Sequence, residues 1–184
     1  ICAADQGWYS QNGKVFYQMD GEKAKGLVTI KGSPFYFDPN TGERLSGWRR
    51  VKGKLYYFGK NGAALTGKQK IGKYQYYFSR NGVLQKDTLI QRTYYAGKRG
   101  QLASGWIHYG VNDYYFDPVT FRMYTGWREI KGKHYYFNAY GQLVKGRMVG
   151  KTWYVNESGE RQYGWGDEGT KRYYLDPDTG KAAK

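Results

Sequence analysis

With 184 residues, the chain is long enough for one ordinary domain or for an array of short repeats. Its 30 Lys and Arg against 15 Asp and Glu give a formal net charge of +15, and Leu, Ile, Val and Phe together are scarce, a combination that usually indicates disorder. The 21 Tyr, 6 Trp and 8 Phe supply the missing apolar area, so we expect an aromatic core. No stretch approaches the roughly 20 apolar residues of a membrane-spanning helix, and we therefore expect no membrane insertion.

Residues 1–6 precede the first repeat and are predicted to form an N-terminal tail. Cys2 is the single cysteine, so no disulfide can form within the chain. Cys2-Ala3-Ala4 before Asp5 would suit a signal cleavage site, although the apolar region that should precede such a site is not in the sequence. The alternative interpretation is an arbitrary domain boundary.

From Gly7 onward the chain repeats a unit of about 20 residues, which begins with a glycine that is often followed by Trp. Within a unit, a short apolar-polar run, a small turn and an aromatic cluster are followed by a second polar turn and a return of small residues. The units begin near residues 7, 26, 47, 67, 87, 105, 126, 146 and 164.

Each unit is predicted to form a β-hairpin. The segment from Gly47 to Gly67 shows the pattern best, because the runs WRRV and LYYF flank the turn Lys52-Gly53-Lys54. An isolated hairpin is marginal in water, so the units must bury their aromatic faces against their neighbours. We therefore predict an all-β fold, a β-solenoid of about nine stacked β-hairpins that forms one domain over residues 7–184.

A longer period accompanies the short one. Leu27–Gly67 matches Trp106–Gly146 at an offset of 79 residues, so four hairpins form a super-repeat. The segments Thr88–Gly105 and Arg147–Gly164 are shortened units that interrupt the regular spacing. They are candidate positions for a bend in the solenoid.

The unit G-W-x-x-[VI]-x-G-K-x-Y-Y-F resembles the cell-wall-binding repeat superfamily, over Gly7–Lys184. That superfamily contains choline-binding repeats, the glucan-binding repeats of streptococcal-type glucosyltransferases and the C-terminal repeats of large clostridial toxins. The resemblance implies a left-handed solenoid, secreted by Gram-positive bacteria, that binds polymers bearing choline or sugar. It also implies an extracellular or cell-wall location, with a catalytic or toxin domain elsewhere in the parent protein.

The residue before the paired tyrosines separates the branches of this superfamily. Choline-binding units usually carry Trp there, which helps to box a trimethylammonium group by cation–π contact. A complete choline cage is therefore not expected here, and the pattern is more similar to the glucan-binding and toxin-type repeats. The residues at this position are Val15, Pro34, Leu55, Gln75, Thr93, Asp113, His134, Thr152 and Arg172.

The tryptophans that follow the repeat glycines are the candidate ligand-binding residues, because in this superfamily they border the groove between hairpins. A pyranose ring can lie flat on such an aromatic face. Of each Tyr pair, such as Tyr56 and Tyr57, at least one member is expected in the core, and Trp153, at a first tyrosine position, is also typical of core. The candidates are Trp106 and Trp127, in consecutive units, with Tyr115, Tyr136, Trp48, Tyr76 and Trp8.

Catalysis, metals and cofactors find little support in the sequence. His108 and His134 have no nucleophile motif near them, and the acidic residues before Pro, such as Asp117, are explained as turn residues. Asp176 and Asp178 supply too few oxygen ligands for a calcium site. We predict that the chain is not an enzyme and that it has no catalytic residues, cofactor or metal.

The basic charge leaves two interpretations open. Lys and Arg recur at turn and return positions, which is typical of a solvated exterior, but they would also attract an anionic wall polymer such as teichoic acid. We do not expect nucleic acid as a partner.

The function predicted from the sequence is a non-catalytic module that binds glucan or wall polysaccharide through aromatic sites between hairpins. One alternative is a choline (teichoic acid) binding module. The other is an adhesin-type or toxin-type segment that binds host glycans or proteins.

Overall fold

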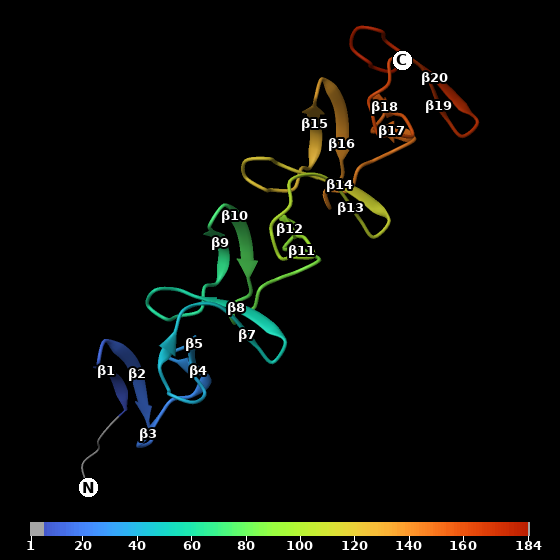
Figure 1. Ribbon diagram of the computed structural model, residues 1–184. Helices are drawn as coiled ribbons and strands as arrows, with labels where there is room; N and C mark the ends of the chain where they lie inside the picture. The colour runs from blue at the N-terminus through green and yellow to red at the C-terminus, as the bar shows by residue number, and fades with distance from the viewer. Residues whose placement is uncertain (1–5, 184) are drawn as a thin grey trace. The chain divides into compact units, whose positions relative to one another are not determined.

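The computed structural model describes residues 6–183, and this part of the chain consists of β-strands and turns with no helix (Figure 1). It therefore offers no helix that is long and apolar enough to cross a membrane. Residues 1–5 of the predicted tail, including Cys2 and the candidate cleavage site, lie outside the described residues.

The strands pair in sequence order into nine antiparallel hairpins, and each begins at or within one residue of a predicted unit start. The prediction of an all-β chain of hairpins is thus confirmed. The hairpins are β1 (Gly7–Gln11) with β2 (Lys14–Met19), β4 (Gly26–Ile30) with β5 (Ser33–Phe37), β7 (Gly47–Val51) with β8 (Lys54–Phe58), β9 (Gly67–Ile71) with β10 (Tyr74–Phe78), β11 (Thr88–Ile90) with β12 (Tyr94–Ala96), β13 (Gly105–Tyr109) with β14 (Asn112–Phe116), β15 (Gly126–Ile130) with β16 (Lys133–Phe137), β17 (Arg147–Val149) with β18 (Trp153–Val155), and β19 (Gly164–Glu168) with β20 (Lys171–Leu175). Short third strands, β3 (Glu22–Lys23) and β6 (Arg44–Leu45), extend the first two hairpins.

The two shortened units of the sequence form the two short hairpins of the structure. β11, β12, β17 and β18 are three residues long, whereas the strands of the other hairpins have five or six. By its internal contacts the chain divides into two compact units, each of several hairpins. The first unit consists of the residues up to Thr88 with Ala96–Leu102, and the second unit consists of Leu89–Tyr95 with the residues from Ala103 onward. A single domain over residues 7–184 stays a prediction.

Within each unit, backbone hydrogen bonds join return segments to the hairpin one repeat earlier. In the first unit, the amide of Leu84 donates to the carbonyl of Leu55 at 2.8 Å. In the second, the amide of Leu143 donates to the carbonyl of Asp113 at 2.8 Å. In both bonds the acceptor is the backbone carbonyl of the residue before the paired tyrosines, and every residue type supplies this carbonyl. That explains why the sequence varies there.

The core of each unit consists of clusters of buried residues, mostly aromatic, to which the second strands of the hairpins contribute. Successive side chains of a strand point to opposite faces, so the first tyrosine and the phenylalanine of a Tyr-Tyr-Phe cluster share a face. Tyr56 and Phe58 are buried, with 5% and 1% of their surface exposed, whereas Tyr57 between them is half-buried. One member of the pair fills the core, as predicted. The fully buried large side chains are Phe37, Phe58, Phe78, Phe116, Phe137, Leu175 and Val155.

Candidate ligand-binding site: the tryptophan boxes

The second face of each GW hairpin carries a packed group of aromatic rings. Trp48 on β7 lies opposite Tyr57 on β8, with ring centroids 5.1 Å apart and an interplanar angle of 78°. Tyr76, from the next hairpin, contacts the same indole at 5.1 Å and 70°, and Phe78 lies beneath it at 5.9 Å. We call this group the Trp48 box. Its third wall comes from a different hairpin, so the box exists only when hairpins stack.

The Trp106 box repeats this geometry in the second unit. Trp106 lies 5.2 Å from Tyr115 at 78° and 5.0 Å from Tyr135 at 71°, and Phe137 lies at 5.8 Å. These values nearly equal those of the Trp48 box, although the two occupy different places in the super-repeat. The box is therefore a repeated feature built by two successive hairpins, and 43% of the surface of Trp106 remains exposed.

Two further boxes have different third walls. Trp8 contacts Tyr17 and Phe35, each at 4.9 Å, and it is also 43% exposed. Trp127 contacts Tyr136 at 5.3 Å and Trp153 at 6.0 Å.

The last GW hairpin, β19–β20, carries an incomplete group. Trp165 contacts Tyr174 at 5.1 Å, but no ring from another hairpin reaches it in the part of the chain up to residue 183. Its side chain is 61% exposed.

The structure places all seven residues predicted from the sequence in these boxes. Trp106 and Trp127 belong to different boxes, the first with Tyr115 and the second with Tyr136. Trp48 and Tyr76 contact each other. Sequence reasoning missed the remaining walls, which are Tyr17, Phe35, Tyr57, Tyr135 and Trp153.

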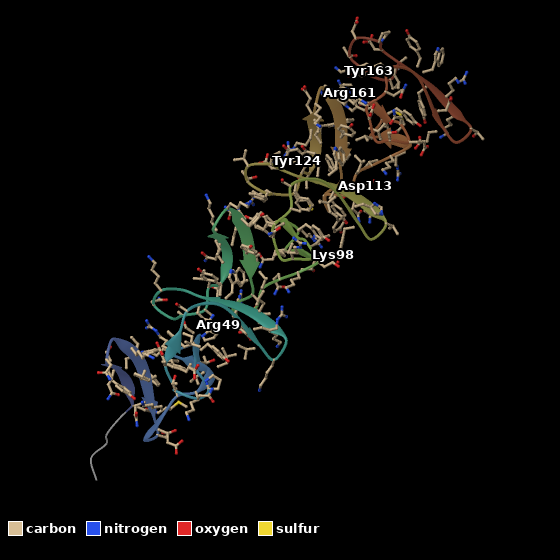
Figure 2. All side chains as sticks on the ribbon, in the orientation of Figure 1. Arg49, Lys98, Asp113, Tyr124, Arg161 and Tyr163 are labelled. Atoms are coloured by element: carbon tan, nitrogen blue, oxygen red, sulfur yellow. The ribbon has the colours of Figure 1, made fainter. Side chains whose placement is uncertain are left out.

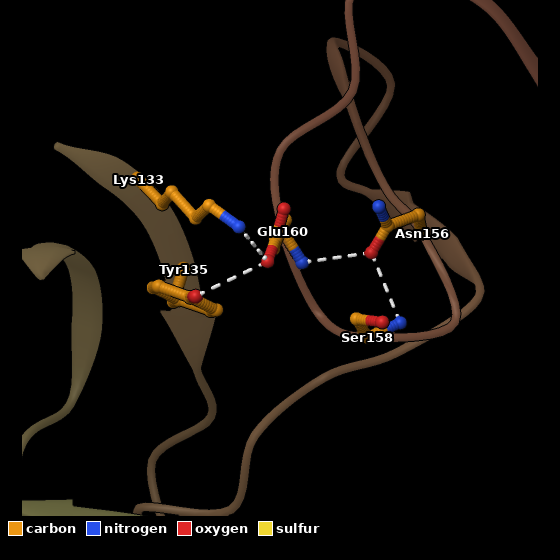
Figure 3. A network of polar contacts seen from close by, with 5 residues as sticks. All are labelled: Lys133, Tyr135, Asn156, Ser158 and Glu160. Atoms are coloured by element: carbon orange, nitrogen blue, oxygen red, sulfur yellow. Dashed lines mark hydrogen bonds and ion pairs between the residues drawn. The ribbon is translucent and has the colours of Figure 1, made fainter. Parts of the chain in front are cut away.

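A polar network holds the third wall of the Trp106 box in place (Figure 3). Glu160 accepts a hydrogen bond from Lys133 at 2.7 Å and one from the hydroxyl of Tyr135 at 3.5 Å. Asn156 in turn accepts from the amides of Ser158 and Glu160, each at 3.0 Å. Burial, and then the charge of Glu160, raises the pKa of Tyr135, so this hydroxyl remains a donor at neutral pH.

The residue two positions after each Trp lies on the same face of the strand. This residue and its cross-strand partner differ between the boxes. Next to Trp106, Asp113 accepts a hydrogen bond from His108 Nδ1 at 2.7 Å and one from Lys145 (Figure 2 labels Asp113). Next to Trp48, the corresponding pair is Leu55 and Arg50. The two boxes thus combine the same aromatic surface with different hydrogen-bonding groups.

We predict that Asp113→Asn makes the unfolding free energy less dependent on acid pH. Hydrogen bonds from Lys145 and then from His108 hold the pKa of Asp113 below its ordinary value. The unfolded state therefore binds the proton more tightly than the folded state, so this stabilisation is present at neutral pH and is lost as the pH falls below about 4. Urea unfolding between pH 2 and pH 6 tests this, and equal slopes for the two proteins would contradict it.

Arginines occupy two of the boxes. The guanidinium of Arg161 lies 4.9 Å from the ring centroid of Trp153, 5.8 Å from that of Trp127 and 5.2 Å from that of Tyr163 (Figure 2 labels Arg161 and Tyr163). Its Nε donates a hydrogen bond to the Tyr163 hydroxyl at 3.0 Å. Arg44 lies 5.6 Å from the ring of Trp8. These are cation–π distances.

The Trp48 and Trp106 boxes lack such a cation within residues 6–183. The return-segment position that Arg44 and Arg161 occupy carries Leu84 and Leu143 there. The chain thus has two boxes with an internal cation and two without one.

Comparisons with known proteins agree with this architecture. Residues 124–160 match a family described as "Choline-binding repeat", and residues 46–64 match the "Putative cell wall binding repeat". Glucosyltransferase-S of Streptococcus mutans is 31% identical over 75% of this chain, and glucosyltransferase-S of Streptococcus downei is 25% identical over 92% of it. The chain spans only 10% and 13% of the length of these two relatives.

Solved structures of similar fold include choline binding protein F of Streptococcus pneumoniae, determined in the presence of a peptidoglycan analogue. It is 29% identical, with a TM-score of 0.71 over 85% of this chain and 57% of that one. CbpJ of Streptococcus pneumoniae is 28% identical, with a TM-score of 0.75 over 86% of this chain and 58% of that one. The choline-binding domain of CbpL matches in fold, at 23% identity and a TM-score of 0.75 over 98% of both chains.

Proposed function

The chain belongs to the superfamily of choline-binding and cell-wall-binding repeat modules, and we propose that it holds its parent protein on a glucan or wall polysaccharide. The observation that carries this proposal is the aromatic box built twice with nearly equal geometry, around the half-buried Trp48 and the exposed Trp106. Such a module acts outside the cell or on its wall. Its role is binding, and any chemistry belongs to other parts of the parent protein.

Sugar stacking fits the shape of these boxes. The indole of Trp106 already contacts three aromatic rings, so a ligand meets its exposed face rather than a gap between rings. A pyranose can lie on that face while its hydroxyl groups bond to neighbours such as Asp113 and His108. Each such contact is weak, but several sites on one polymer raise the overall affinity through effective concentration.

The relatives support the same ligand class. Two of them are glucosyltransferases, and the matched segment is a small part of each. We propose that this segment serves there, as here, to hold the protein on glucan.

Retention on cross-linked dextran, and separately on purified Gram-positive cell walls, tests the proposal. We expect the chain to be retained and to be released by soluble dextran or wall polysaccharide. Failure to bind any glycan surface would refute it. Release by free choline from a choline-like resin, without glycan binding, would establish the choline alternative instead.

The choline alternative has specific support in the matched repeat family and in the similarity to choline binding protein F. Against it stands the lack of Trp before the tyrosines in each described hairpin, so that the Trp48 box has Leu55 where a further ring would stand. A segment that binds host glycans or proteins with the same boxes is the remaining alternative, and immobilised host glycans form a further arm of the retention experiment.

We predict that Arg161→Leu lets the Trp127 box bind a quaternary ammonium ion, because this box has a second tryptophan, Trp153, where the Trp48 and Trp106 boxes have a tyrosine. In the wild type, the guanidinium already lies within cation–π distance of Trp127 and Trp153. Leu occupies the equivalent position beside the Trp48 and Trp106 boxes, so this substitution suits the fold. A choline titration followed by the Trp127 indole NMR signal should show saturable shifts only in the variant.

Arg80→Leu, which removes an exposed arginine of the first unit, is the control for loss of one positive charge. Equal choline binding at Trp127 in the wild type and in Arg161→Leu would show that the arginine does not occupy the box.

A further inference from the structure

The second unit contains an arginine-lined pocket that none of the tryptophan boxes explains. Its volume is about 430 Å³, and its lining includes Arg92, Arg122, Arg128, Asp117 and Tyr124 (Figure 2 labels Tyr124). It draws these side chains from three places in the chain: the turn between β11 and β12, the loop after β14, and β15. We call it the arginine pocket.

The charge in the arginine pocket is positive and largely uncompensated. Asp117 is its acidic residue, and Oδ1 of this carboxylate accepts hydrogen bonds from the amides of Val119 and Thr120 at 2.9 and 2.7 Å. Oδ2 accepts from the hydroxyl of Tyr124 at 3.1 Å. The carboxylate is therefore engaged by its own turn. No salt bridge among residues 6–183 joins any of the three arginines to an acid.

Two of the guanidinium groups lie over the faces of aromatic rings. Arg128 lies 5.2 Å from the ring centroid of Tyr124, and Arg92 lies 4.6 Å from that of Tyr140. A guanidinium stacked on a ring keeps its N–H donors at its edge, where they can bind an oxyanion in the plane of the group.

Arg92 stands where the fold favours glycine. Eight of the nine hairpin turns contain a glycine, whereas the fifth, Gln91-Arg92-Thr93, has none. Both Gln91 and Arg92 have positive φ, at 48° and 51°. In the four two-residue turns with positive φ at both positions, such as Lys52-Gly53, the second residue is glycine. A long side chain in this conformation costs free energy, and residues held this way cluster at functional sites.

The corresponding place in the first unit does not form such a site. At the 79-residue offset, Glu43 stands in place of Arg122, and it forms an ion pair with Lys14 at 2.7 Å. Leu45 stands in place of Tyr124, and Gly13 in place of Arg92. Arg128 has a counterpart in Arg49, but Arg92 and Arg122 have none, so the scaffold does not require arginine at these two positions and their presence in the second unit needs another reason.

We infer that the arginine pocket binds a phosphate group, in the form of a phosphodiester carried by an anionic polymer. A carboxylate presents its two oxygens in one plane, whereas the tetrahedral phosphodiester directs its two free oxygens and two ester oxygens in three dimensions, which suits fork-shaped donors that come from three places in the chain. The aromatic contacts continue outward from the pocket, because Tyr124 lies 5.0 Å from Tyr115 of the Trp106 box. A polymer with alternating sugar and phosphate groups could occupy both. The pocket does not depend on the tryptophan boxes for its binding.

An NMR titration with inorganic phosphate, and then with the phosphodiester dimethyl phosphate, tests this inference at constant ionic strength. We expect saturable shifts of the Arg92, Arg122 and Arg128 side-chain N–H signals and little response to acetate. Arg92→Gly should weaken phosphate binding about tenfold or more, since it removes one charge-assisted donor group. Because glycine is the usual residue in these turns, this variant should fold at least as well as the wild type.

Arg80→Gln is the control, because it removes one positive charge from an exposed turn of the first unit. Equal weakening by Arg80→Gln and Arg92→Gly, or shifts spread evenly over all basic residues, would show a diffuse charge effect and overturn the inference. An equal response to acetate would replace the phosphate ligand with a carboxylate. Glycan retention is measured separately, so a failure of either proposal is distinguishable from a failure of the other.

Discussion

Replacing both Trp48 and Trp106 with leucine is expected to weaken retention on a glycan surface by at least about 100-fold. Each substitution removes the indole ring, half-buried at Trp48 and exposed at Trp106, from a box that carries no internal cation. Loss of two sites on one polymer also removes the gain from multivalency, which can reach a factor of 100 or more. Retention on dextran or cell walls, compared at equal protein concentration, measures the effect.

Leucine is the appropriate substitute because Leu27 occupies the same strand position in β4, opposite Tyr36. The double variant should therefore keep its hairpins, and circular dichroism checks this. Trp165→Leu is the matched control, since Trp165 is more exposed than Trp106 but contacts one ring only. If Trp165→Leu weakened retention as much as the double variant, simple exposure of indole rings would explain binding and the boxes would not.

Phe137→Ala is expected to cost about 3–5 kcal/mol of unfolding free energy in the second unit. The side chain is fully buried, belongs to a core cluster with Ile130 and Tyr135, and supports Trp106 from below at 5.8 Å. Its removal leaves a cavity that neighbouring hairpins cannot close without breaking their own ring contacts. Urea unfolding followed by tryptophan fluorescence measures the loss.

Val119→Ala provides the matched control, because Val119 is 83% exposed in a turn of the same unit. An exposed substitution of this kind is expected to change the unfolding free energy by no more than about 0.5 kcal/mol. If Phe137→Ala were equally mild, the buried clusters would not be what stabilises the hairpin stack.

The hairpins themselves could be predicted because their determinants are local. A turn glycine such as Gly53 and the alternation of Leu55, Tyr56 and Tyr57 fix the turn and the two faces of the strand. The shortened units were also visible in the sequence, since a missing residue in a regular period needs no knowledge of packing. Both features appear in the structure at the predicted places.

The composition of each box could be predicted only in part. Trp106 and Tyr115 are partners within one hairpin, and the strand register follows from the turn. Tyr135 reaches the same indole from the next hairpin, and this contact depends on how hairpins stack, which no local pattern reports. The alternation of faces predicts which side chains of a strand share a face, but it does not predict the hairpin against which that face packs.

The internal cations could not be predicted for a related reason. Arg161 lies in a return segment, and its position is apolar in Leu84 and Leu143, so the residue type alone suggests an exposed charge. Only the contact with Trp153 shows that its guanidinium faces an aromatic group. The net positive charge is therefore not only a diffuse exterior, because some of the arginines belong to specific sites.

The central claim is that tryptophans in boxes built by two successive hairpins bind the ligand, and the six indole N–H signals of the chain test it most directly. In a titration with soluble dextran oligosaccharides, or with wall polysaccharide fragments, we expect saturable shifts at Trp48 and Trp106 and little change at Trp165. The absence of indole shifts with every glycan, or shifts confined to Trp165, would contradict the claim.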